Sequence, residues 1–168
     1  MNRKLKNIIA KLEGRVLIIG FDDVDLTDCI NNNTNIIDCD SLNLNNKAKE
    51  NGKLGKTVNI KKLRKIYKKK KLDYIIVNME AVEKYSKYFI KDSIYICKQK
   101  IYVFGANKDF IKSYKRYDVE VASKKLKDSN LFEINAIKSK NNIILDNFYF
   151  IYDIVTELLD KIGDVLTS

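Results

Sequence analysis

The chain has 168 residues, of which 45% are hydrophobic and 32% are charged, and its net charge is +10. This size and composition are typical of one folded domain and exclude a disordered chain. No apolar run approaches the roughly 20 residues of a membrane-spanning helix. The start, MNRKLKNIIAKLEG, carries charges through its apolar part and is unlike a signal peptide. We therefore predict a cytoplasmic protein with no membrane partner.

The cysteine content points to the same compartment. Cys29, Cys39 and Cys97 are odd in number and show no CxxC spacing. This pattern favours free thiols over a disulfide framework. A Cys29–Cys39 disulfide is the alternative that the sequence leaves open.

The N-terminal part is predicted to begin with an amphipathic helix over residues 2–13, which ends at Gly14. Its apolar stripe consists of Leu5, Ile8, Ile9 and Leu12. The apolar run at 16–19 follows as a buried strand and stops at Gly20. Acidic residues from Asp22 onward are typical of a helix start, so a short helix ending at 31–33 is expected. NIIDC at 35–39 is the second predicted strand.

The middle of the chain continues the alternation. Residues 42–57 are polar and contain two glycines, which predicts a loop with room for one helical turn, followed by a residual strand at 58–59. Asn59 is placed to cap a helix over 60–71. The later elements are expected to be a strand at 72–79, a helix at 81–96, a strand at 100–104 stopped by Gly105, and a helix at 108–117.

The pattern changes to a period of two near the end. Residues 119–125 and 131–138 alternate and are separated by KDSN, which predicts an antiparallel hairpin. Residues 147–166 are predicted to form a long helix with a heptad-like apolar seam. This helix either docks on its own sheet or forms a homodimer. The predicted fold class is α/β, a three-layer Rossmann-like domain with a mostly parallel sheet ending in an antiparallel hairpin, plus a C-terminal helix. The single domain spans 1–168, with a core at 1–140 and a C-terminal helical extension at 141–168.

Most of the positive charge lies in residues 61–71, KKLRKIYKKKK, which hold eight basic residues and no acid. Such a run is commonly a solvated face. The functional alternative is a binding surface for nucleic acid or an acidic partner. The candidate contacts are Lys61, Lys62, Arg64, Lys65, Lys68 and Lys69. Since Tyr67 is the only aromatic residue in the run, binding is expected to be independent of base sequence.

Two enzyme motifs match in part. DVDLT at 23–27 fits the DxDxT nucleophile motif of haloacid-dehalogenase-like phosphatases, but no late acidic pair accompanies it. A receiver-like reading has the acid pair Asp22 and Asp23 and a late Lys124, yet Asn78 stands where a phosphoacceptor aspartate is required. A calcium loop is excluded, because Asp28 occupies the position where the loop needs glycine. No metal site is predicted.

The order of elements, with a helix before the first strand and a hairpin after the fifth, resembles a class I S-adenosylmethionine-dependent methyltransferase over about residues 5–138. In that family a glycine-rich turn after the first strand passes under the amino acid end of the cofactor. Here IIGFDD supplies Gly20, and Phe21 follows it where the family has further glycines, so the motif is degenerate. The resemblance also implies that an acid ending the second strand holds the ribose hydroxyls. Asp38 and Asp40 are the candidates, with Asp40 preferred.

The resemblance places the residues nearest the transferred methyl at the end of the fourth strand, here Asn78 and Glu80. VNMEA lacks the Asn-Pro-Pro-aromatic pattern of enzymes that methylate amino groups of bases, which disfavours that acceptor. Methyl transfer rests largely on alignment, and a base such as Glu80 is needed only where the acceptor must lose a proton. The implied cofactor is S-adenosylmethionine, with an unknown acceptor. The alternative function is a non-catalytic interaction domain of the same fold that uses the basic run.

Overall fold

The structure, a computed structural model, describes residues 2–22, 24–26, 29, 32–125, 130–137 and 155. The chain separates into two units, Met1–Ile137 and Lys138–Ser168, and all described residues except Val155 belong to the first. The helix and homodimer seam expected at 147–166 thus lie outside the described residues and stay predictions. Among the helices that are described, none is long and apolar enough to cross a membrane.

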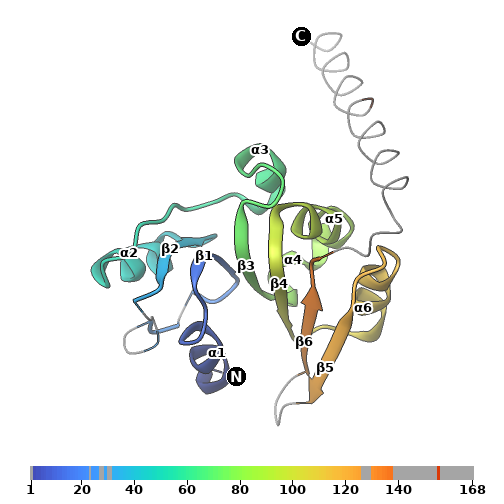
Figure 1. The fold of residues 1–168 in the computed structure, drawn as a ribbon, viewed down its shortest axis with the longest axis horizontal. Helices are drawn as coiled ribbons and strands as arrows, with labels where there is room; N and C mark the ends of the chain where they lie inside the picture. The colour runs from blue at the N-terminus through green and yellow to red at the C-terminus, as the bar shows by residue number, and fades with distance from the viewer. Residues whose placement is uncertain are drawn as a thin grey trace. The chain divides into compact units, whose positions relative to one another are not determined.

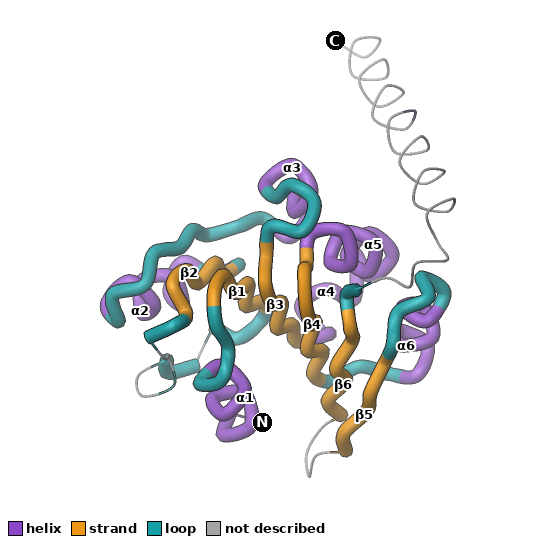
Figure 2. The backbone as a smooth tube through the Cα atoms, viewed as in Figure 1, coloured by secondary structure: helices purple, strands orange, loops and turns teal. Residues whose placement is uncertain are grey.

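Strands and helices alternate along the first unit (Figure 1, with the same view as a tube in Figure 2). The strands are β1 (Gly14–Ile19), β2 (Thr34–Cys39), β3 (Leu72–Asn78), β4 (Cys97–Phe104), β5 (Val121–Lys125) and β6 (Asn130–Asn135). The α-helices are α1 (Asn2–Ile9), α2 (Leu42–Glu50), α3 (Leu63–Ile66), α4 (Met79–Val82), α5 (Ser86–Ile96) and α6 (Lys108–Lys115). Two 3-10 turns, η1 (Ile60–Lys62) and η2 (Glu83–Tyr85), precede α3 and α5.

The strands form one six-stranded sheet in the order β2-β1-β3-β4-β6-β5. β1 to β4 pair in parallel, and β6 runs antiparallel to both β4 and β5. The predicted mostly parallel sheet with a terminal hairpin is confirmed. From β1 the chain moves to one side for β2 and to the other side for β3, so the strand order reverses beside β1. Open α/β sheets bind ligands at the carboxyl ends of strands flanking such a reversal.

Helices cover both faces of the sheet, as the alternation of buried side chains requires. In β1, Val16 and Ile18 pack in the same cluster as residues of α1 and α2. Leu17 and Ile19 pack in the cluster that includes residues of α3, α5 and α6. All four side chains are fully buried. β1 is therefore covered by helices on both faces of the sheet. This confirms the predicted three-layer arrangement.

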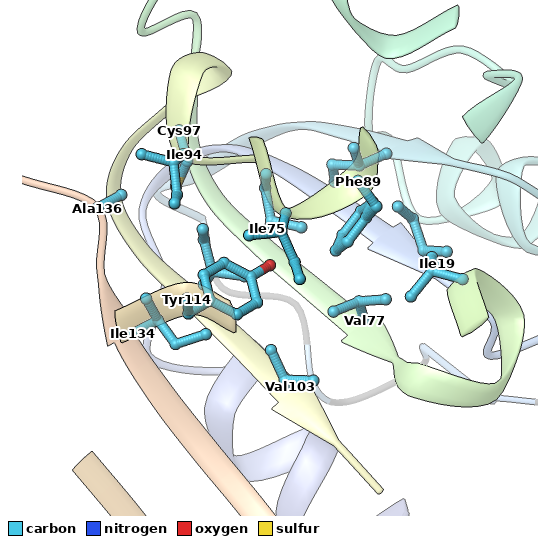
Figure 3. Packing of buried hydrophobic residues seen from close by; sticks show 14 of the residues in the cluster. Ile19, Ile75, Val77, Phe89, Ile94, Cys97, Val103, Tyr114, Ile134 and Ala136 are labelled. Atoms are coloured by element: carbon cyan, nitrogen blue, oxygen red, sulfur yellow. The ribbon is translucent and has the colours of Figure 1, made fainter. Parts of the chain in front are cut away.

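A buried tyrosine of α6 contacts α5 inside the core. Figure 3 shows Tyr114 lying among Ile75, Val103 and Ile134, and its side chain is fully buried. Its hydroxyl is 2.9 Å from Oγ of Ser93, which itself donates to a backbone carbonyl of α5 at 2.9 Å. The Tyr114 hydroxyl therefore donates to Ser93. This pairing satisfies both buried polar groups and joins the two helices inside the core.

The prediction of a loop at 42–57 was wrong for its first half, where the residues form helix α2. Ser41 caps this helix by accepting from the backbone N–H of Leu44 at 3.4 Å. Leu44 and Ala48, one helical turn apart, are fully buried against the sheet. The asparagine-rich composition concealed the cap and this narrow apolar stripe.

The segment after α2 runs beside β2 as a short edge. Backbone N–H groups of Ile37 and Cys39 donate to the carbonyls of Leu54 and Lys56 at 2.8 and 3.1 Å. Val58 N–H then donates to the carbonyl of Cys39 at 2.7 Å. The segment is bridged to β2 in parallel but forms no full strand. It brings the chain back to the carboxyl end of β2 before η1 begins.

The short helix predicted after β1 is not found in the described residues of that segment. Val24, Leu26 and Cys29 are buried in the core on the α1 side and have no helical conformation. Their spacing of two and three residues does not follow a helical stripe. The acidic residues that suggested a helix start were a weaker signal than this spacing.

The helix predicted over 60–71 is also shorter than expected and ends at Ile66. Tyr67 is extended, with φ −117° and ψ 134°, and Lys70 has a φ of +53°. The Tyr67 hydroxyl donates to Asp38 at 2.6 Å. The Nζ atom of Lys70 donates to three backbone carbonyls at 2.7–3.0 Å, those of Ile94, Cys97 and Ala136. These long-range contacts outweigh the helix propensity of the lysines.

The three cysteines are free, as predicted, and the structure also shows that they are buried. Burial, together with the negative charges of the nearby Asp40, Asp38 and Asp22, raises the pKa of Cys39 to about 12. Burial likewise raises the pKa of Cys97 to about 12. We expect no thiol of the native protein to react with iodoacetamide near pH 8, since the thiolate is the reactive form, and all three to react in denaturant. Mass spectrometry counts the adducts, and an adduct on the native protein would contradict this expectation.

Candidate functional site

The carboxyl ends of the four parallel strands meet at one edge of the sheet. Gly20 follows β1 and Gly105 follows β4, and both have positive φ, +76° and +73°. Asn78 ends β3 between them. A Cβ at Gly20 would lie 3.2 Å from Asn78 Cβ, and a Cβ at Gly105 would lie 3.5 Å from Asn78 Oδ1. The edge therefore presents bare backbone on either side of one amide side chain.

Asp40, just beyond β2, completes this edge. The backbone N–H of Gly20 donates to both carboxylate oxygens of Asp40, at 3.0 and 3.1 Å. Burial raises the pKa of the Asp40 carboxyl; the Gly20 hydrogen bond opposes this shift and the charge of Asp22 adds to it. Two residues that the sequence singled out separately, Gly20 and Asp40, are thus in direct contact.

Asp38 has a different role from Asp40. Its side chain is fully buried, and its Oδ1 accepts from the backbone N–H of Lys56 at 3.0 Å. Its Oδ2 accepts from Nε of Arg15 at 2.8 Å and from the hydroxyl of Tyr67 at 2.6 Å. Asp38 therefore connects β1, β2 and the middle of the basic run, just after α3 ends. Of the two aspartates, only Asp40 presents its oxygens at the edge.

Several solved structures have a similar fold at low sequence identity. The PH0226 protein from Pyrococcus horikoshii has a TM-score of 0.59 at 12% identity, over 79% of this chain and 87% of that one. A methyltransferase from Geobacter sulfurreducens has a TM-score of 0.56 at 8% identity, over 80% and 77%. The M. capricolum TrmK, solved with S-adenosylhomocysteine, has a TM-score of 0.55 at 16% identity, over 80% and 68%. The fold is that of the class I S-adenosylmethionine-dependent methyltransferases. No protein-family model and no curated protein matches the sequence.

Phe21 stands where this methyltransferase fold would pass a turn under its cofactor. Its side chain is 4% exposed, and its ring lies 5.5 Å from that of Phe104 at an interplanar angle of 83°. The ring thus belongs to the core on the α1 side. The Phe21 ring therefore packs in the core and does not project from the carboxyl edge of the sheet.

Asn78 and Glu80 lie where β3 passes into α4. Asn78 caps α4, and its Oδ1 accepts from the backbone N–H of Glu80 at 3.4 Å. Glu80 is exposed in the first turn of that helix, where a negative charge is favourable. Both residues therefore serve the start of the helix, and their catalytic roles stay predictions.

The exposed lysines predicted as a binding surface lie away from the core. Lys61, Lys62, Lys65, Lys68 and Lys69 are exposed, whereas Arg64 is partly buried against α5. The run spans η1, α3 and the turn before β3. The predicted contacts therefore share one stretch of surface, although they do not share one helix.

Sequence reasoning missed the contribution of Gly105 and of Asp22 to the edge. The sequence predicts Gly105 only as the end of a strand, although the same signal, a glycine directly after an apolar run, locates Gly20. The sequence assigns Asp22 to a helix start or to a receiver-like acid pair, whereas its charge raises the pKa of the Asp40 carboxyl. Both residues could have been found by applying the strand-end argument to every parallel strand.

The glycine at position 20 is required by packing as well as by its backbone conformation. A Cβ there would lie 2.6 Å from Cβ of Ala81, whereas at Gly52, which has a φ of +72°, it would meet nothing within 4 Å. We expect Gly20→Ala to lower the free energy of unfolding by about 2–4 kcal/mol, from left-handed strain and overpacking. Gly52→Ala should cost only the strain, about 1–2 kcal/mol. Urea unfolding followed by circular dichroism measures both, and equal losses would contradict the close approach of α4.

Proposed function

We propose that this chain binds S-adenosylmethionine at the carboxyl edge of its sheet, with Asp40 accepting the hydrogens of the ribose hydroxyls. The observation that carries the proposal is the contact of both Asp40 oxygens with the Gly20 N–H. A carboxylate has about four lone-pair sites, so one backbone donor fixes its orientation and leaves capacity for two hydroxyl groups. Asp38, with three protein donors, lacks this capacity.

The rest of the edge fits the cofactor. At Gly105 a Cβ would meet only Asn78 Oδ1, at 3.5 Å, so a ligand can approach the backbone there closely. At Gly20 the corresponding space is filled by Ala81 of α4. Asp22 and Asp40 make the edge acidic, and an acidic edge favours a ligand that carries a positively charged sulfonium. The bound cofactor would supply a methyl group on a good leaving group. The task of the protein is then to hold the acceptor in line with that methyl.

Asn78 and Glu80 are the side chains we propose nearest to that methyl. They follow β3, the strand between the two glycine-ended strands β1 and β4. Glu80 is exposed, so it can take a proton from an acceptor that must lose one. Asn78, held as a helix cap, provides a fixed amide at the same place.

Titration calorimetry of the full chain with S-adenosylmethionine and S-adenosylhomocysteine tests the proposal, with adenosine as a third ligand. We expect micromolar binding of both cofactor forms and weaker binding of adenosine. No heat at millimolar ligand, from protein whose circular dichroism shows it folded, would overturn the proposal. That outcome would favour the second candidate, a non-catalytic domain of this fold whose exposed lysines bind a partner.

A further inference from the structure

The basic run lies along helix α5, and contacts at both ends fix it there. Nζ of Lys61 lies 4.8 Å from the centre of the Tyr85 ring, just before α5. The Arg64 guanidinium lies 4.6 Å from the centre of the Tyr95 ring near the other end of the helix. The backbone N–H of Lys70 donates to the Tyr95 carbonyl at 3.0 Å. The run and the helix therefore form one continuous surface.

Helix α5 adds aromatic rings to this surface. Phe89, Ile90, Ser93 and Ile94 are the buried side chains of its inner face. Tyr88, Lys91 and Tyr95 recur at i, i+3 and i+7 on the opposite side of the helix. Tyr88 is 77% exposed. Because Tyr67, the aromatic residue of the basic run, is buried, the exposed aromatic ring on this surface comes from the neighbouring helix.

The charge of this surface is predominantly positive. We call it the basic face and define it by Lys61, Lys62, Lys65, Lys68, Lys69, Lys84, Lys87 and Tyr88, all of which are exposed. Asp92, the acid on the same stretch of α5, lies 3.7 Å from Nε of Arg64. Glu83 is exposed at its margin. Seven exposed lysines on the basic run and at the start of α5 produce a positive local field.

One end of the basic face begins at the candidate cofactor edge. The Val58 N–H donates to the carbonyl of Cys39 at the end of β2, and Asn59 then caps η1, where Lys61 and Lys62 lie. Tyr85, which Lys61 contacts, is seven residues beyond Asn78 at the end of β3. A long ligand on the basic face could therefore reach the edge that carries Asp40 and Asn78.

We propose that the basic face binds single-stranded nucleic acid, with lysines contacting phosphates and Tyr88 stacking on a base. Lysines spaced along a backbone-tracking surface supply affinity without reading sequence, and an exposed aromatic ring stacks on any base. An acidic protein partner would use the lysines but would not require the Tyr88 ring. This inference is independent of cofactor binding, since none of its residues lies in the Gly20–Asp40 contact.

Fluorescence anisotropy with a labelled single-stranded oligouridine of about 20 nucleotides tests the proposal. We expect binding that weakens steeply with salt, with a slope of log affinity against log salt of about −0.7 for each phosphate contacted. Tyr88→Ala should weaken binding by roughly tenfold, the scale of one lost base stack, and Tyr88→Phe should restore it. Because Tyr88 is exposed, neither change should alter the fold.

A charge reversal and its matched control locate the surface. Lys65→Glu with Lys68→Glu should abolish most of the binding. Lys11→Glu with Lys49→Glu makes the same change in net charge at exposed positions next to α1 and on α2, which cover the other face of the sheet, and should have a much smaller effect. No binding at low salt, equal losses in the two double variants, or an unchanged affinity of Tyr88→Ala would each overturn the proposal. Displacement of the oligonucleotide by polyglutamate at equal charge concentration would also overturn it, in favour of an acidic protein partner.

Discussion

Replacing Asp38 with alanine is expected to lower the free energy of unfolding by about 3–5 kcal/mol, the scale for breaking a buried ion pair from one side. Asp38 is fully buried, and its oxygens accept from Arg15, Tyr67 and the backbone N–H of Lys56. Without the carboxylate, the Tyr67 hydroxyl, on a side chain that is 2% exposed, loses its acceptor. The Arg15 guanidinium loses its counter-charge while the rest of the chain still partly buries it.

Urea unfolding with Asp109→Ala as the control measures this effect. Asp109 also forms an ion pair, with Lys112 at 3.2 Å, but its side chain is 88% exposed. Its removal should cost about 1 kcal/mol or less, because water replaces the interaction. A loss for Asp38→Ala no larger than that for Asp109→Ala would contradict the assignment.

A milder variant keeps the test informative if Asp38→Ala does not fold. Tyr67→Phe removes one hydrogen bond to Asp38 and preserves the ring that packs in the core. We expect it to cost about 1–3 kcal/mol, since a hydrogen bond to a charged group is lost. An unchanged urea midpoint would show that this hydrogen bond contributes nothing to the stability of the fold.

The strands of this protein were predictable because their signal is local. In a run such as Val16–Ile19, four adjacent aliphatic side chains are buried. A strand covered on both faces is the structure that buries all of them. The early end of the helix predicted over 60–71 was not predictable from the sequence. Tyr67 leaves the helix to donate a hydrogen bond to Asp38, which lies 29 positions earlier. Helix α2 was missed for another reason. Its buried apolar stripe is narrow, and asparagines fill many of the other positions.

The candidate site shows the same division between local and long-range information. A glycine after a buried strand and acids after the next strand were sufficient to place Gly20 and Asp40 at one edge. The sequence favoured Asp40 over Asp38, two residues earlier, but could not show what holds Asp38 inside the core. The difference comes from Arg15 and Tyr67. Both donate hydrogen bonds to Asp38 and hold its carboxylate inside the core. Such partners become neighbours only in the folded sheet.

Asp40→Asn is expected to change stability and ligand binding in opposite directions. The pKa of Asp40 is raised in the folded protein, so ionising this carboxyl costs stability, and that cost appears as the pH rises through the raised pKa. Asparagine keeps an oxygen for the Gly20 N–H and removes the buried charge. The variant should therefore be at least as stable as the wild type near pH 7. The difference should shrink as the pH falls toward the ordinary aspartate value of about 3.9.

The same variant should bind S-adenosylhomocysteine at least tenfold more weakly, because hydrogen bonds from two hydroxyls to a charged group are worth about 1.5–3 kcal/mol each. Thermal unfolding across pH and titration calorimetry measure the two effects on one protein sample. A loss of stability near pH 7 would make Asp40 a structural residue, and an unchanged affinity would remove it from the cofactor site. A gain in stability with a loss of affinity is the pattern of a residue retained for binding at some cost to the fold.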